Sequence, residues 1–137
     1  MKLTAKLDYA CRVLAQLAKR YDGAVVSSIE ELASVEEIPA KYLAQILSDL
    51  RNGGLVESRR GKQGGYLLAK APDKITLFDV IALIEGDQFS EPAGASGESG
   101  PSVAEAWSEV QNRFEKSTRS VTLADLAARE TREMYYI

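Results

Sequence analysis

The sequence contains no histidine and only one cysteine, Cys11, among its 137 residues. The absence of histidine excludes His-based general acid–base catalysis, catalytic triads that use histidine and the common His-ligated metal sites. A single cysteine forms no intrachain disulfide, and it cannot by itself supply the thiolates that an iron–sulfur cluster needs. No nucleophile–base pair is recognisable, so we expect that the chain is not an enzyme.

Long apolar runs are also lacking. Charged residues interrupt every hydrophobic stretch, and the N-terminal residues include no apolar segment of signal-peptide length. The hydrophobic fraction of 45% and the charged fraction of 27% are typical of a soluble globular protein. We therefore expect a cytoplasmic protein of one domain, or of one domain with an arm, and no membrane partner.

The formal net charge of −3 argues against a uniformly basic nucleic-acid binder. The charge is unevenly distributed, however. Residues 1–74 carry 12 Lys and Arg against 9 Asp and Glu, whereas residues 75–137 carry 5 against 11. The first half is therefore at +3 and the second at −6, so the first half can face a polyanion while the second serves another purpose.

Three segments of the first half show the apolar spacing of α-helices. The first covers about residues 5–20, with Thr4 as its N-cap. The second is a short helix after Ser28, which forms a predicted capping box with Glu31. The third has Pro39 in its first turn and ends near residue 52, before two glycines.

A β-hairpin is predicted to follow, with strands at residues 55–60 and 66–69. Its turn, residues 61–65, contains Gly61, Gly64 and Gly65. Three cations stand at or beside this turn: Arg59, Arg60 and Lys62. Glycine allows the backbone to approach a groove wall closely, and arginine suits a narrow minor groove of DNA.

The second half divides into a helix, a loop and two further helices. Residues 75–85 read as a helix capped by Thr76. Residues 86–102, rich in Gly, Ser and Pro, read as a flexible loop, and a long helix at about 102–119 and a last helix capped by Thr122 and ending at Arg129 follow. We expect a DNA-binding domain at 1–85, a sensing loop at 86–102, and a dimerisation helix with a C-terminal helix and tail at 103–137.

Three short helices followed by a hairpin predict a winged helix-turn-helix, so the fold class is mainly α with a small β-hairpin wing, joined to a long helix. In this fold the third helix enters the major groove of DNA. Lys41, Ala44 and Gln45 point outward from it; Lys41 can reach phosphate or guanine, and Gln45 can pair with adenine. Each feature alone also fits an ordinary solvated surface, but their order favours double-stranded DNA as the partner.

The residues that carry a family resemblance run from Met1-Lys2-Leu3-Thr4 through Tyr42-Leu43 and Gln45-Ile46-Leu47 to Gly64-Gly65-Tyr66-Leu67-Leu68-Ala69. On these motifs the chain resembles the Rrf-two (IscR-, NsrR- and CymR-like) family of bacterial transcription regulators, over nearly its whole length. The resemblance implies a homodimer, more often a repressor than an activator, that reads a pseudo-palindrome. It implies DNA contacts at Lys2, Thr4, Lys41, Ala44, Gln45, Arg60 and the wing. It also implies dimerisation through the long helix, whose apolar face carries Val103, Trp107, Val110 and Phe114.

The chain departs from the cluster-binding members of that family, because no cysteine stands in residues 86–102. Ser90, Ser96 and Ser102 occur at the spacing of the family's ligand cysteines. This pattern fits replaced ligands, a naturally cluster-free member, or chance in a serine-rich loop. Serine hydroxyls are poor substitutes for thiolates, so we expect no cluster or other cofactor in this chain. Cys11 lies on the apolar face of the first helix and is expected to be a buried structural thiol.

A second function class remains open at this point. A winged helix can act as a protein-interaction module that docks a metabolic enzyme, as the CymR-like members suggest, with weak or no DNA binding. The loop can also take a small-molecule effector. The terminal Tyr135, Tyr136 and Ile137 serve either as interface anchors or as packing against the dimer helix. The positive first half favours DNA over the docking alternative.

Overall fold

A computed structural model describes residues 2–22, 25–89 and 94–136, with side chains described as far as residue 129. Three helices form the first half of the domain: α1 (Ala5–Lys19), α2 (Ile29–Glu36) and α3 (Ala40–Asn52). The predicted N-caps of the first two are confirmed. The Thr4 hydroxyl accepts a hydrogen bond from Leu7 N, and the Ser28 hydroxyl accepts one from Glu31 N. The Glu31 carboxylate does not return the bond of a capping box but forms an ion pair with Arg20 at 2.8 Å.

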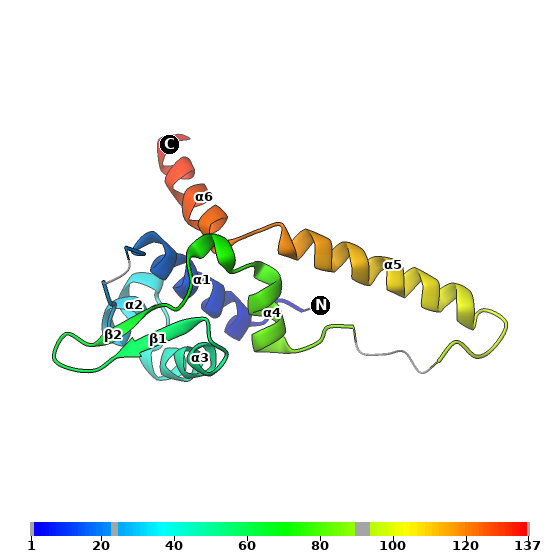
Figure 1. Cartoon of the computed structure of the whole chain (residues 1–137), viewed down its shortest axis with the longest axis horizontal. Coiled ribbons are helices and arrows are strands. Elements are labelled where there is room, and N and C mark those ends of the chain that lie inside the picture. The colour runs from blue at the N-terminus through cyan, green and yellow to red at the C-terminus, as the bar shows by residue number, and fades with distance from the viewer. Residues whose placement is uncertain (1, 23–24, 90–93, 137) are drawn as a thin grey trace.

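The wing consists of two antiparallel strands, β1 (Val56–Arg59) and β2 (Gly65–Leu68). Val56 pairs with Leu68 at the inner end, and Arg59 pairs with Gly65 beside the turn. Ser27 adds a bridge on the other side of β2, because its backbone N and O both bond to Tyr66 at 2.9 and 2.8 Å. The hairpin is thus tied to the segment before α2, and its tip projects from the domain (Figure 1).

The second half begins with a short 3₁₀ turn, η1 (Pro72–Lys74), and with α4 (Leu77–Glu85), which Thr76 and Asp79 start with a full capping box. A 20-residue helix, α5 (Gly100–Arg119), and α6 (Leu123–Tyr136) follow. The C-terminal end of α5 lies against α4, and its N-terminal part extends away from the domain (Figure 1). A backbone bridge between Thr76 and Thr122 joins the starts of α4 and α6.

Two predicted boundaries were wrong. The long helix begins at Gly100, so Ser102 lies in its first turn and not in the preceding loop. Pro101 explains the earlier start, since proline is favoured in the first turn of a helix, where its missing N–H costs nothing. The last helix continues to Tyr136 and does not end at Arg129. The predicted packing of Tyr135 and Tyr136 concerns side chains outside the described residues, and Ile137 lies outside them entirely.

The core lies where α1 meets α2, α3, α4 and α6. Fully buried leucines from α1, α2 and α3 form its centre, and Leu123 anchors the start of α6 in it. This arrangement confirms the predicted fold class, a mainly helical winged helix-turn-helix with a long added helix. A helix long and apolar enough to cross a membrane does not occur within the described part of the chain.

Candidate nucleic-acid interface

The exposed face of α3 carries the predicted base-reading residues. Leu43, Ile46, Leu47 and Leu50 are buried against the domain, as the apolar stripe predicted. The intervening positions therefore face outward: Lys41 and Gln45 are exposed, and Ala44 is half-buried. A lysine ammonium and a glutamine amide provide hydrogen-bonding groups for a major-groove edge, and the alanine methyl is small enough to lie against a thymine methyl.

Asp49 orients Gln45 on this face. Its carboxylate accepts a hydrogen bond from Gln45 Nε2 at 3.2 Å and an ion pair from Lys6 of α1 at 2.9 Å. The contact raises the pKa of Lys6 and lowers that of Asp49 from their ordinary values, so both stay charged at neutral pH. This contact uses one N–H of the Gln45 amide. The second N–H and the carbonyl are the donor and acceptor that pair with adenine N7 and N6.

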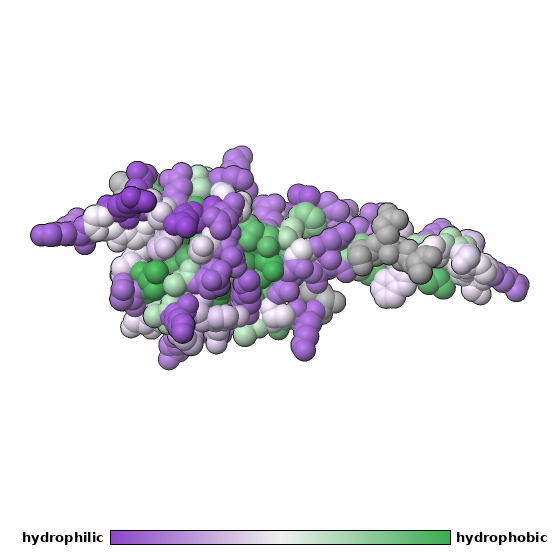
Figure 2. Space-filling model, turned by 90° about the horizontal axis from the view of Figure 1, so that it is seen from below, coloured by the Kyte–Doolittle hydropathy of each residue, from purple (hydrophilic) through white to green (hydrophobic). Residues whose placement is uncertain are grey.

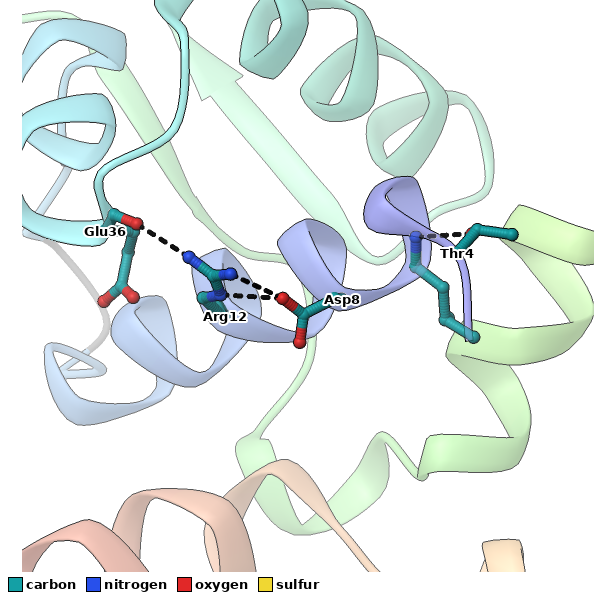
Figure 3. Close-up of polar contacts among 5 residues, drawn as sticks. Thr4, Asp8, Arg12 and Glu36 are labelled. Atoms are coloured by element: carbon teal, nitrogen blue, oxygen red, sulfur yellow. Dashed lines mark hydrogen bonds and ion pairs between the residues drawn. The ribbon is translucent and has the colours of Figure 1, made fainter. Parts of the chain in front are cut away.

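Arg12 of α1 connects this helix to the end of α2, where the turn between α2 and α3 begins (Figure 3). Its guanidinium contacts Asp8 one turn earlier at 2.6 Å, and it donates to the carbonyl of Glu36, the last residue of α2, at 3.1 Å. It also lies 5.0 Å from the centre of the Tyr9 ring, and Tyr9 meets Tyr42 of α3 edge-to-face at 5.6 Å. None of these contacts was predicted from the sequence, although the i, i+4 spacing of Asp8 and Arg12 favours the first of them.

The wing presents its cations to solvent. Arg59, Arg60 and Lys62 are all exposed, and Arg59 pairs loosely with Glu57 at 3.7 Å. In the view of Figure 2, hydrophilic residues cover the projecting hairpin tip. Within the part of the chain that the structure describes, no hydrogen bond or ion pair engages the side chains of Arg60 and Lys62. Both are therefore available to a phosphate or a groove floor.

The three wing glycines have different structural roles. Gly61 has φ = +116° and faces open space, so its backbone conformation alone requires glycine. A Cβ on Gly64 would lie 2.5 Å from the carbonyl oxygen of Arg59, and a Cβ on Gly65 would lie 2.4 Å from that of Ser27. Gly64 and Gly65 are thus needed for the turn and for its attachment to Ser27, whatever contact they make with DNA.

The N-terminal segment is partly engaged inside the protein. Lys2 is exposed, as a phosphate contact requires. The Thr4 hydroxyl accepts from Leu7 N as the α1 cap and donates to the Glu85 carboxylate at the end of α4. Its proton is therefore not free for a phosphate, and the role of Thr4 in this structure is to join α1 to α4.

Helix α5 carries an apolar face with no covering element. Val103, Trp107 and Val110 are 51%, 55% and 46% exposed, and none of the 20 residues of α5 is buried. Phe114, the fourth predicted dimerisation residue, differs: it is half-buried against the core and meets Phe89 edge-to-face at 5.3 Å. The first three residues form a stripe on the protruding arm, while Phe114 anchors the arm to the domain.

The serine positions of the loop do not form a visible cluster of ligands. Ser96 is exposed in the loop, Ser102 is in α5, and Ser90 lies outside the described residues. Within the described ranges, no three His, Cys, Asp or Glu side chains converge as metal ligands do. Cys11 lies far from this loop in the sequence, on α1, where it is half-buried against the core.

We predict that Cys11 reacts slowly with thiol reagents. Burial, with a smaller contribution from the Asp8 carboxylate, raises the pKa of its thiol to about 11. The thiolate fraction near neutral pH is therefore roughly 100-fold lower than for an ordinary cysteine, and the thiolate is the reactive form. The check is the rate of reaction with Ellman's reagent in the native protein and in urea. Equal rates would contradict the prediction, and a Cys11→Ser variant gives the background.

The geometry defines a class of protein. A helix-turn-helix with an exposed polar face on α3, a wing with exposed cations and a protruding helix with an apolar stripe together form a DNA-binding winged helix with an arm. Comparison with known proteins identifies the family within this class. A model of the Rrf2 family, described as an iron-dependent transcriptional regulator, matches residues 3–129. The chain belongs to this Rrf2 (Rrf-two) family.

Individual relatives agree with that assignment. The HTH-type transcriptional regulator CymR of Bacillus subtilis is 35% identical over an alignment covering 100% of both chains. The solved structure of CymR, the global cysteine regulator of B. subtilis, superposes with a TM-score of 0.82 at 34% identity, over 94% of this chain and 98% of that one. IscR of T. potens superposes with a TM-score of 0.75 at 30% identity, over 95% and 88%. The chain is therefore a DNA-binding transcriptional regulator and not an enzyme, as the sequence predicted.

Proposed function

We propose that the protein is a cytoplasmic homodimeric repressor that reads a pseudo-palindromic operator. The observation that carries the proposal is the outward face of α3, where Lys41 is exposed and Asp49 accepts a hydrogen bond from the Gln45 amide at 3.2 Å. Each α3 enters a major groove, and Arg60 and Lys62 of the wing reach the neighbouring minor groove. The two half-sites are held in register by pairing of the apolar stripe on α5.

The acidic second half fits this arrangement. Residues 75–137 carry a net charge of −6, and they include the whole of α5 and α6. Placed against DNA, this charge would be repelled, so the electrostatic field orients the protein with α3 and the wing toward the duplex. Occupation of a promoter by such a dimer blocks transcription.

Simultaneous Gln45→Ala and Arg60→Ala substitution is expected to lower operator affinity by about 30-fold or more. A base contact and a groove contact are each worth roughly 1–3 kcal/mol, and both side chains are exposed, so folding is unaffected. Operator DNA is first selected from a random pool with the purified wild-type protein, and affinity is then measured by fluorescence anisotropy at several salt concentrations. The variant should also show a shallower dependence on salt, because fewer counterions are released.

A matched control removes the same groups elsewhere. Asn112→Ala with Arg113→Ala deletes one amide and one guanidinium from the exposed surface of α5, off the apolar stripe. This variant is expected to bind the operator as the wild type does. Equal affinity of the Gln45/Arg60 variant and the wild type would show that these two residues do not contact DNA.

We further propose that this member of an iron-dependent family works without a cluster. The available donors do not fit a cluster: the loop offers a serine hydroxyl at 96 and the first turn of α5 offers one at 102, and the single thiol, Cys11, is on α1 and half-buried. Iron–sulfur clusters are held chiefly by thiolates, and hydroxyl groups of serine stay protonated at neutral pH.

Anaerobic reconstitution is the test of the cluster-free form. After incubation with ferrous iron and sulfide and removal of the excess, the protein is expected to show no absorbance band in the visible region. A relative that carries loop cysteines, treated in parallel, shows that the procedure works. A visible band together with protein-bound iron and sulfide would overturn the proposal.

A further inference from the structure

A cavity of about 190 Å³ lies where the C-terminal half of α5 meets α4. Residues from α4, from the segment that follows it and from α5 line its walls. The apolar lining is dominated by three phenylalanine rings: Phe78 of α4, Phe89 of the following segment and Phe114 of α5. Ile81 and Ala82 complete the apolar wall on the α4 side. This site lies apart from α3 and the wing, and the proposed DNA contacts do not use it.

A few polar groups complete the lining. Gln88 and Gln111 offer side-chain amides, and Asp87 and Glu115 offer carboxylates. Three of these four are already oriented. Asp87 accepts a hydrogen bond from Phe89 N at 3.0 Å, Glu115 pairs with Arg119 at 2.9 Å, and Gln88 Nε2 donates to the carbonyls of Glu85 and Gly86 at 3.3 Å, which leaves its side-chain carbonyl for a ligand. An apolar cavity with few, fixed polar groups is the usual form of a small-molecule site.

The size and charge of the cavity define what it can hold. Engineered apolar cavities of about 150 Å³ bind benzene, so about 190 Å³ accommodates one aromatic ring with a small substituent. None of the described lining residues is basic, and two, Asp87 and Glu115, bear carboxylates. Arg119, which lies 4.0 Å from the centre of the Phe78 ring, neutralises Glu115, so the charge of Asp87 remains and disfavours anions. Carboxylate and amide oxygens also need N–H or O–H donors, so a ligand with such a donor fits better than a bare hydrocarbon.

The cavity is connected to the DNA-binding face by direct contacts. Glu85 immediately precedes the lining residue Gly86, and its carboxylate accepts the hydrogen bond from Thr4, the N-cap of α1. In the first turn of α1, Lys6 pairs with Asp49, which accepts a hydrogen bond from Gln45. A ligand that shifts the end of α4 therefore acts on the start of α1, and through Lys6 on the orientation of the α3 side chain that faces the base edges.

We propose that this cavity binds a small, uncharged aromatic molecule bearing an N–H donor, and that its occupancy changes operator affinity. The second part of this proposal rests on the proposed repressor function. The contacts that transmit the effect are those of Glu85 with Thr4 and of Lys6 with Asp49.

Benzamide is a suitable probe, because it is one ring with an uncharged amide donor. Its binding to the full-length wild-type protein is followed by amide chemical-shift changes in a ¹⁵N-labelled sample. Shifts are expected at residues 78–89 and 111–115. Benzoate, of the same size but anionic, is expected to bind at least tenfold more weakly. No shifts at these residues, or equal binding of benzoate, would overturn the assigned ligand class.

Two variants locate the site. Ala82→Phe fills the cavity from an exposed position on α4 and is expected to weaken benzamide binding at least tenfold, whereas Ala128→Phe on the exposed surface of α6 should have no effect. Gln111→Leu, which keeps the volume but removes the amide, gives a second check. Wild-type benzamide affinity in both Ala82→Phe and Gln111→Leu would overturn the site.

The link to DNA is measured separately, as operator affinity with and without saturating benzamide. A change of at least threefold that is lost in Glu85→Leu, which removes the acceptor of the Thr4 proton but leaves Thr4 able to cap α1, supports the link. Bound benzamide with unchanged operator affinity would overturn the link alone. Failure of the wild-type protein to bind any selected DNA would instead overturn the repressor function and leave the ligand site standing on its chemical shifts.

Discussion

Val110→Glu is expected to convert a dimer into a monomer and to lower affinity for a two-half-site operator by at least about 100-fold. Val103, Trp107 and Val110 lie within about 60° of each other around α5, so they form one stripe, and all three are exposed in the single chain. A carboxylate placed there must be buried unpaired when two stripes meet, which is strongly unfavourable. In a dimer, binding of one domain holds the second domain at a high effective concentration near the second half-site. A monomer lacks this advantage.

The measurements are molar mass by light scattering and operator affinity on the same samples. Asn112→Glu is the matched control, because it adds the same charge to the same helix at an exposed position roughly on the opposite side from the stripe. It should remain dimeric. A duplex with one half-site separates the two causes: Val110→Glu should bind it as tightly as the wild-type domain does. A dimeric Val110→Glu protein with full operator affinity would show that the stripe is not the interface.

Local signals were sufficient to predict most of the helix starts. Thr4, Ser28, Thr76 and Thr122 were each recognised as N-caps, and each accepts a hydrogen bond from an amide three residues later. Such caps depend only on neighbouring residues, so the sequence contains the necessary information. The outward positions of α3 were predictable for a similar reason, since the burial of one stripe determines the opposite face.

Contacts between distant segments were not predictable in this way. Nothing near Thr4 in the sequence indicates that its hydroxyl also bonds to Glu85, 81 residues later. Asp49 looked like one more solvated charge on α3, but it joins Lys6 of α1 to Gln45. These pairs arise only when α1 packs between α3 and α4. The difference between exposed Val110 and half-buried Phe114 was likewise not predictable, because both lie on the apolar face of α5.

Gly65 was predicted to lie in the turn, and it has a structural role in the wing that the sequence did not indicate. Its sequence neighbours indicated a turn in which glycine lets the backbone approach a groove wall of DNA. In the structure Gly65 begins β2, and the position of its missing Cβ lies 2.4 Å from the carbonyl oxygen and 2.6 Å from the carbonyl carbon of Ser27. A real Cβ cannot occupy that position, and the atoms that it would meet are backbone, which no side-chain rotation can move aside.

Gly65→Ala is therefore expected to destabilise the free protein by about 2–3 kcal/mol. The added methyl group must push the wing away from Ser27, which weakens the two backbone hydrogen bonds to Tyr66 and opens tight packing; overpacking of this kind costs roughly 1–3 kcal/mol, and each hydrogen bond about 1 kcal/mol. Urea unfolding without DNA measures the effect. Gln63→Ala, at an exposed position of the same turn, should change stability by less than about 0.5 kcal/mol.

The comparison of stability with operator affinity decides between the two roles of this glycine. If Gly65 serves only to approach DNA, Gly65→Ala lowers operator affinity and leaves the free energy of unfolding at its wild-type value. If Gly65 attaches the wing to the segment before α2, stability falls in the absence of DNA, and the affinity falls as well because the wing that carries Arg60 and Lys62 is displaced. The close approach to Ser27 favours the second outcome, since the clash exists whether or not DNA is bound.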